Sequence, residues 1–178
     1  PFYPNEKSWE EICKNTSRFV RERIDTVDFF NGQTLPSKEM INRFDTFIIG
    51  SDQVWRDSYG RVESYFGDFL KTENKKIFSY AASFGLSSWQ FDRERTEKLR
   101  VLAKRFRSIS VREKDAIELC RDNLNIEANW VLDPTMLLSK NDYISLFKDN
   151  FQEKSEGDLM TYILDSSEEK IRLIKLIE

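Results

Sequence analysis

The stretch FDTFIIGSDQVWR, residues 44–56, joins a short apolar run to a polar loop and then to a tryptophan. The residues from Phe44 to Ile49 are mostly apolar and β-forming, which predicts a buried strand that ends at Gly50. A strand that needed only a tight turn would continue into Asn-Gly or Asp-Gly. Here the strand continues into Gly-Ser-Asp-Gln. The stretch therefore predicts a strand whose carboxyl end carries a polar loop.

Helices and further strands alternate around this stretch. Ser8-Trp9-Glu10-Glu11 is typical of a capping box, so a helix is expected from there to about Ile24. Three more strands are expected at Ile77–Ala81, Ser108–Val111 and Trp130–Leu132, with helices between them over 93–106 and 115–124. The order β, α, β, α, β predicts an α/β domain with a mostly parallel sheet and crossover helices.

The last forty residues predict a separate β-α unit. A short helix through Phe147 and a polar linker around Gly157 precede a strand over 159–164 and a helix over 168–177. We therefore expect two domains, residues 1–150 and residues 151–178. Because the chain starts with Pro1 and stops inside a helical pattern, we also expect it to be trimmed at both ends.

Composition excludes several classes of function. The chain carries 28 basic and 31 acidic side chains, so its overall field does not attract nucleic acid. It contains two cysteines far apart and no histidine, which argues against a structural zinc site, histidine acid–base chemistry and a Ser-His-Asp triad. The free thiols, together with the lack of a signal peptide or an apolar stretch of membrane-spanning length, predict a cytoplasmic protein. No metal site is expected.

Candidate site residues follow from the topology. Ligands of open parallel sheets collect at the carboxyl ends of the strands, where loops meet helix N-termini. Four segments fall there: Gly50-Ser51-Asp52-Gln53, Ser83-Phe84-Gly85, Arg112-Glu113 and Asp133-Pro134-Thr135. Gly50 would let a ligand approach the backbone, Asp52 could accept hydrogen bonds or act as a base, and Arg112 could grip a carboxylate or phosphate.

Purely structural interpretations stay open for these residues. Ser51 or Asp52 could simply cap a helical turn while Trp55 fills the core. An ion pair of Arg112 with Glu113 or with Asp133 could merely tie two loops together. The sequence lacks G-x-G-x-x-G and G-x-x-x-x-G-K-[ST], so dinucleotide or P-loop binding is not supported. No spacing singles out two carboxylates for glycoside hydrolysis.

Four segments in order, FDTFIIGSDQVWR, KKIFSYAASFG, SISVRE and VLDPTMLL, resemble the polysaccharide pyruvyl transferase family, and YFGDFL between the first two strengthens the match. The resemblance covers roughly Phe44 to Leu138. It implies a Rossmann-like, mostly parallel sheet with helices on both faces, as one lobe of a two-domain fold like that of GT-B glycosyltransferases. It also implies transfer of pyruvate from phosphoenolpyruvate onto two hydroxyls of a sugar as a ketal, in bacterial surface polysaccharide biosynthesis, with no cofactor.

The resemblance gives the candidate residues roles. Arg112 would bind the donor and stabilise the departing phosphate, and Glu113 would orient Arg112 or carry a proton. Asp52 would act with them in catalysis. The substrate-binding wall would comprise Gly50, Ser51, Gln53, Trp55, Ser83, Gly85, Asp133 and Thr135, with Trp55 either packed behind the loop or placed against a sugar face. The acceptor would be a lipid- or nucleotide-linked sugar, which leaves a peripheral association with a membrane open.

The departures from the family are at the two ends. The family's first strand, with its N-x-G-D type turn, would precede Pro1, and its S-F-H-G segment with an active-site histidine would follow Glu178. Residues 1–178 alone are therefore expected not to turn over substrate. Two other functions remain: a glycosyltransferase-like lobe that uses a nucleotide sugar, and a non-catalytic lobe for sugar binding or assembly.

Overall fold

The computed structural model describes residues 9–26, 35–70, 75–147 and 167–176. The chain divides into two compact units, Pro1–Leu138 and Ser139–Glu178. The second unit contains α6 (Lys140–Phe147) and α7 (Glu168–Lys175), which begin close to the predicted positions. The predicted linker around Gly157 and the strand over 159–164 lie outside the described residues.

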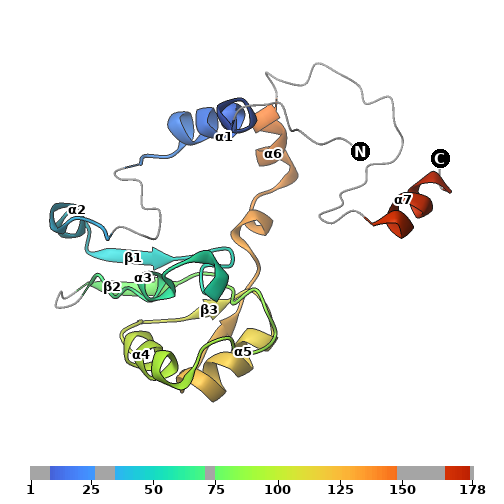
Figure 1. Ribbon diagram of the computed structural model, residues 1–178. Coiled ribbons are helices and arrows are strands. Elements are labelled where there is room, and N and C mark those ends of the chain that lie inside the picture. The colour runs from blue at the N-terminus through green and yellow to red at the C-terminus, as the bar shows by residue number, and fades with distance from the viewer. Residues whose placement is uncertain (1–8, 27–34, 71–74, 148–166, 177–178) are drawn as a thin grey trace. The chain divides into compact units, whose positions relative to one another are not determined.

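The first unit is built on parallel strands (Figure 1). β1 (Thr46–Ile49) pairs with β2 (Lys76–Ser79), and β3 (Ser110–Val111) pairs with β4 (Asn129–Trp130), both in parallel. Two isolated parallel bridges, Phe78 to Ser108 and Ala82 to Val111, connect the two pairs. The strands therefore lie side by side in chain order, and the sequence-based prediction of parallel pairing is confirmed.

A bulge separates these two bridges. The chain takes four steps from Phe78 to Ala82 but only three from Ser108 to Val111, so one residue is extra on the first side. Ala81 accordingly lies at a φ of 51°. Buried hydroxyls replace the interrupted ladder, because Ser110 Oγ accepts from Ala81 N at 3.1 Å and donates to the carbonyl of Ser79 at 2.9 Å. The bulge redirects the chain just before the loop at residues 83–85.

The helices of the first unit lie before β1 and in the connections between the strands. They are α1 (Trp9–Arg23), α2 (Lys38–Asn42), α3 (Val62–Tyr65), α4 (Arg93–Ala103) and α5 (Asp115–Leu119), with a π-turn at Cys120–Leu124 and 3-10 turns at Asp57–Tyr59 and Pro134–Leu137. The helical spacing and capping patterns correctly predicted α1, α4 and α5. Four short elements were not predicted, namely α2, α3 and the two 3-10 turns, because single turns show too little periodicity.

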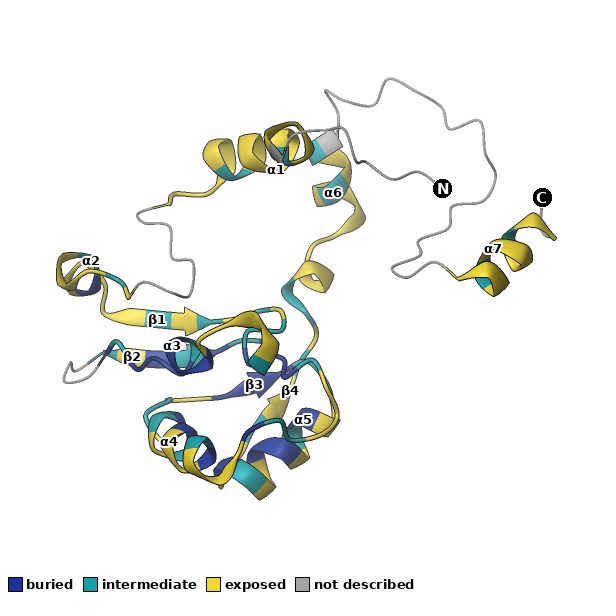
Figure 2. Cartoon of the chain, in the orientation of Figure 1, coloured by how far each residue is buried: buried dark blue, intermediate teal, exposed yellow. Residues whose placement is uncertain are grey.

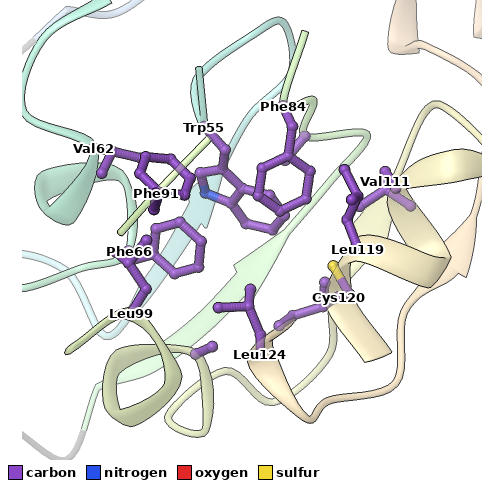
Figure 3. Packing of buried hydrophobic residues seen from close by; sticks show 14 residues of the cluster. Trp55, Val62, Phe66, Phe84, Phe91, Leu99, Val111, Leu119, Cys120 and Leu124 are labelled. Atoms are coloured by element: carbon purple, nitrogen blue, oxygen red, sulfur yellow. The ribbon is translucent and has the colours of Figure 1, made fainter. Parts of the chain in front are cut away.

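Helices α3, α4 and α5 share one apolar core with β3. Trp55 is at its centre, stacked on Phe66 with ring centroids 4.7 Å apart and packed near Phe84 at 5.1 Å (Figure 3). The indole N–H donates to the carbonyl of Tyr65 at 3.1 Å, so the buried ring has no unpaired polar group. Figure 2 shows this buried layer between the strands and helices α4 and α5.

Helices on both faces of the sheet are not confirmed among the described residues, because the three connecting helices pack on one core. Val62, Leu99 and Leu119, from α3, α4 and α5, all belong to one core cluster with Val111 of β3. Crossovers between parallel strands are almost always right-handed. When strand order follows chain order, that rule places the connecting helices on one side. Ile48 of β1 is correspondingly 67% exposed.

Candidate functional site

Arg112 is the centre of the candidate site. Its guanidinium leaves the end of β3 and contacts three carboxylates: Nη2 lies 3.2 Å from Asp52, Nη1 lies 3.0 Å from Asp133, and Nε lies 3.0 Å from Glu113. Asp52 follows β1, and Asp133 follows β4. The parallel sheet thus brings together the strand ends that the sequence nominated. The side chain of Arg112 is 24% exposed and therefore remains open to solvent.

Backbone hydrogen bonds hold these loops in place. Ser83 N donates to the carbonyl of Asp52, and Trp55 N donates to the carbonyl of Ser83, each at 3.0 Å. On the other side, Arg112 N donates to the carbonyl of Ala82 at 3.3 Å. The loop around residues 82–83 therefore bridges the Asp52 loop and Arg112. This arrangement explains how two residues sixty positions apart reach each other.

Asp133 links the arginine to the turn that follows β4. One of its carboxylate oxygens accepts from Thr135 N at 3.0 Å and from Thr135 Oγ1 at 2.8 Å, and the other faces Arg112. The hydrogen bonds from the backbone and hydroxyl of Thr135, with a further contribution from Arg112, lower the pKa of Asp133. Asp133 is therefore a fixed negative charge that orients the guanidinium.

The cluster carries more negative than positive charge. Burial by itself lowers the pKa of Arg112, but the hydrogen bonds that Arg112 donates to Glu113, Asp133 and Asp52 outweigh it and raise the pKa. Three carboxylates face this one cation, and each of its three nitrogens is already engaged. The three hydrogen bonds leave one N–H on Nη1 and one on Nη2, but an anionic ligand that approaches them must compete with three carboxylates for the charge of Arg112. Asp52 is the most exposed of the three, at 78%.

Both structural interpretations of the loop can now be judged. The two expected ion pairs of Arg112, with Glu113 and with Asp133, are both formed, so the arginine does tie loops together. No described helix is capped by Ser51 or Asp52, because the next turn begins at Asp57 with Arg56 as its N-cap. The carboxylate of Asp52 is directed to Arg112 instead, from a backbone φ of 67°.

The side chains of Trp55 and Ser83 do not line the predicted substrate-binding wall. Both side chains are 0% exposed. Trp55 fills the core, and Ser83 Oγ accepts from Gly85 N at 2.9 Å, which shapes the turn. Their side chains therefore support the loop from behind, and the sugar-facing position considered for Trp55 is wrong. The tryptophan in the opening stretch is therefore explained by its burial, which anchors the polar loop after β1 to the core.

Gly50 is required by a close approach of backbone, and Gly85 is favoured by its positive φ. Gly50 has a φ of 125°, and a Cβ there would collide with the carbonyl oxygen of Tyr80. Gly85 has a φ of 71°, and a Cβ would lie 2.9 Å from Arg56 Cδ and 2.5 Å from Gln53 Oε1. Gly50 also lines a cavity of about 390 Å³ beside β1, whose other lining residues are mostly apolar. Arg112 does not line this cavity.

Two residues beside the cluster were missed by the sequence reasoning. Arg56 donates to Gln53 Oε1 at 2.7 Å, directly next to the Asp52 loop. Trp130 is 51% exposed, and its indole N–H donates to the carbonyl of Arg112 at 3.0 Å. Lys114 lies over the Trp130 ring at 4.7 Å from its centroid. Arg56 directly follows the GSDQVW segment, and a basic residue at that position was the sequence signal that could have identified it.

The part of the chain that the structure describes contains no group of three Asp, Glu, Cys or His side chains that could hold a metal ion. Within the same residues, no helix has the length and apolarity needed to cross a bilayer.

Comparison with known proteins gives the family directly. A family model described as polysaccharide pyruvyl transferase matches residues 3–177, nearly the whole chain. Searches of curated proteins and of solved structures found no match. The family match extends well beyond the four segments that carried the resemblance. The chain belongs to the polysaccharide pyruvyl transferase family.

Proposed function

We propose that this protein transfers pyruvate from phosphoenolpyruvate to two hydroxyls of a sugar, as a cyclic ketal in bacterial surface polysaccharide assembly. The described α/β unit would be one Rossmann-like lobe of a GT-B-like fold, with residues 1–150 as the first domain and residues 151–178 as the start of the second. The acceptor would be a lipid- or nucleotide-linked sugar, met in the cytoplasm or at a membrane surface. No cofactor is needed for this reaction.

The reaction balances without an added oxidant or reductant. One sugar hydroxyl attacks the carbon that bears the phosphate, and the neighbouring methylene takes up a proton to become a methyl group. The second hydroxyl then attacks the same carbon, and the bond between this carbon and the phosphate oxygen breaks. Two carbon–oxygen bonds form, one breaks, and the phosphate leaves with the second proton. The reaction needs a cation near the leaving phosphate and a base near the attacking hydroxyls.

The Arg112 cluster supports this proposal because it combines both requirements at one solvent-accessible strand end. Arg112 would bind the carboxylate or phosphate of the donor and stabilise the departing phosphate. Asp52, the most exposed carboxylate, would leave the guanidinium when the donor binds and then accept a proton from the acceptor hydroxyl. Glu113 would hold Arg112 or carry a proton, and Asp133 with Thr135 would keep the guanidinium in place.

Titration of the intact protein separates the enzymatic alternatives. Phosphoenolpyruvate should bind and a UDP-sugar should not bind in its place, as followed by calorimetry. Incubation with phosphoenolpyruvate and a panel of UDP-linked and lipid-linked sugars should release inorganic phosphate and give a pyruvylated sugar in the mass spectrum. Binding of UDP-sugars without binding of phosphoenolpyruvate would instead favour the glycosyltransferase-like function.

One observation favours a non-catalytic sugar-binding lobe as a second candidate. Three carboxylates surround a single arginine, and carboxylate oxygens accept hydrogen bonds from sugar hydroxyls without needing a net positive site. Such a lobe would bind oligosaccharide but release no phosphate from phosphoenolpyruvate.

A further inference from the structure

The donor expected here carries two anionic groups, whereas the cluster at Arg112 is net negative. Its single guanidinium is matched by three carboxylates within 3.2 Å. Displacing one carboxylate would still leave two facing the cation. A phosphate and a carboxylate on one small molecule therefore need a second positive charge nearby.

Arg56 is a cation that the fold places beside the Asp52 loop of this cluster. It follows the loop that carries Asp52, and Nη1 donates to Gln53 Oε1 at 2.7 Å. Its guanidinium carbon lies 5.1 Å from the centroid of the Tyr59 ring, a cation–π distance. Both partners are neutral, and among the described residues no carboxylate lies within ion-pair distance of Arg56. Arg56 is half-buried, so its charge is only partly screened.

The opposite loop leaves room for this side chain. Gly85 lies on the loop that hydrogen-bonds the Asp52 segment through Ser83. A side chain at Gly85 would press on Arg56 Cδ and Gln53 Oε1. The absence of a Cβ at this position therefore lets Arg56 lie between the two loops, where Gln53 holds one edge of the guanidinium. An edge of this group remains available to a ligand, since a guanidinium has five N–H donors in a fork.

We propose that Arg56 is a second donor-binding residue, which holds one anionic group of phosphoenolpyruvate, phosphate or carboxylate, while Arg112 holds the other. This inference rests on the proposed function. Gln53 and Tyr59 position Arg56, and Gly85 keeps its place open. The pair of arginines, one from each of two loops, divides the charge of the donor between them and selects a dianionic ligand over a neutral sugar.

The test is calorimetric titration of the intact protein with phosphoenolpyruvate, in the wild type and in Arg56→Gln, Arg56→Lys and Arg107→Gln. Arg107 is an exposed arginine that precedes β3, at the other end of that strand from Arg112, and serves as the matched control. Loss of charge-assisted hydrogen bonds should weaken donor affinity roughly 10- to 100-fold in Arg56→Gln. Arg56→Lys should recover part of the loss, and Arg107→Gln should bind like the wild type. Melting temperatures should agree within about 2 °C, because Gln53 and Tyr59, the described hydrogen-bond and ring partners of the Arg56 side chain, are not buried.

The outcomes distinguish this inference from the proposed function. Wild-type affinity in Arg56→Gln, together with loss of binding in Arg112→Gln, would overturn the role of Arg56 and leave the transferase function standing. If the wild type bound no phosphoenolpyruvate, both would fall. A loss in Arg56→Gln that was matched by a large drop in melting temperature would also overturn the inference, since it would indicate a structural role.

Discussion

Replacement of Arg112 by glutamine should damage donor binding far more than it damages the fold. The guanidinium contacts three carboxylates whose side chains range from 23% to 78% exposed. Partly solvated ion pairs contribute between 0 and about 1 kcal/mol each. The three contacts together therefore stabilise the unit by about 1–2 kcal/mol. The variant should melt roughly 3–8 °C below the wild type.

The loss in donor affinity should be larger because it is a loss of charge-assisted bonds to a ligand. Two such hydrogen bonds contribute about 1.5–3 kcal/mol each. Part of this gain is offset in the wild type, since the donor must compete with three carboxylates for the charge of Arg112. A net loss of about 2–4 kcal/mol corresponds to a roughly 30- to 1000-fold weaker affinity for phosphoenolpyruvate. Calorimetry measures the affinity, and thermal denaturation followed by circular dichroism measures the stability.

Asp52→Asn should change donor affinity in the opposite direction to Arg112→Gln. Asparagine keeps the shape of the side chain but removes the negative charge that competes for Arg112 Nη2. Donor affinity should therefore rise several-fold while turnover falls, if Asp52 accepts the hydroxyl proton.

If Arg112→Gln lowered the melting temperature yet bound phosphoenolpyruvate within twofold of the wild type, Arg112 would be only a connection between loops, and the site proposed here would be refuted.

Other substitutions test the core, the bulge and the buried groups. Trp55→Ala should cost about 3–5 kcal/mol in urea unfolding, because it empties the centre of the core. Ser110→Ala should cost about 1–3 kcal/mol by leaving Ala81 N–H without its acceptor, and an unchanged unfolding midpoint would argue against the role of the bulge. Burial raises the pKa of Glu63, but hydrogen bonds and its basic neighbours lower it overall, below its ordinary 4.5. The stability that Glu63 contributes is thus present above about pH 4.5 and is lost as pH falls through the lower folded-state pKa; Glu63→Gln should flatten this loss in acid unfolding. Burial raises the pKa of Cys120 to about 12, so a maleimide should label Cys120 at pH 8 only after unfolding; rapid labelling of Cys120 in the folded protein, told apart from labelling of the more accessible Cys13 by peptide mapping, would contradict its burial.

The sequence alone determined much of the architecture. Apolar runs of strand length and helical spacing located four strands and the longer helices, because these patterns follow from local periodicity. It also indicated which loops would meet, since parallel strands bring their carboxyl ends to one edge. Asp52, Arg112 and Asp133 were nominated on that basis, and they are in contact. The family, too, was recognisable from four short segments and is shown by the whole-chain match.

Only the tertiary structure decided how the side chains are used. The sequence left Trp55 open between the core and a sugar face and placed Ser83 in the binding wall, whereas both lie in the interior, where packing and a turn hydrogen bond require them. The three helices that connect the strands, α3, α4 and α5, share one core, because strand order follows chain order. The surplus of carboxylates around Arg112 and the position of Arg56 depend on loops from distant parts of the chain. The hydrophobic periodicity of a segment indicates whether that segment forms a helix or a strand. Contacts between loops depend on how distant segments pack together, which no single segment encodes.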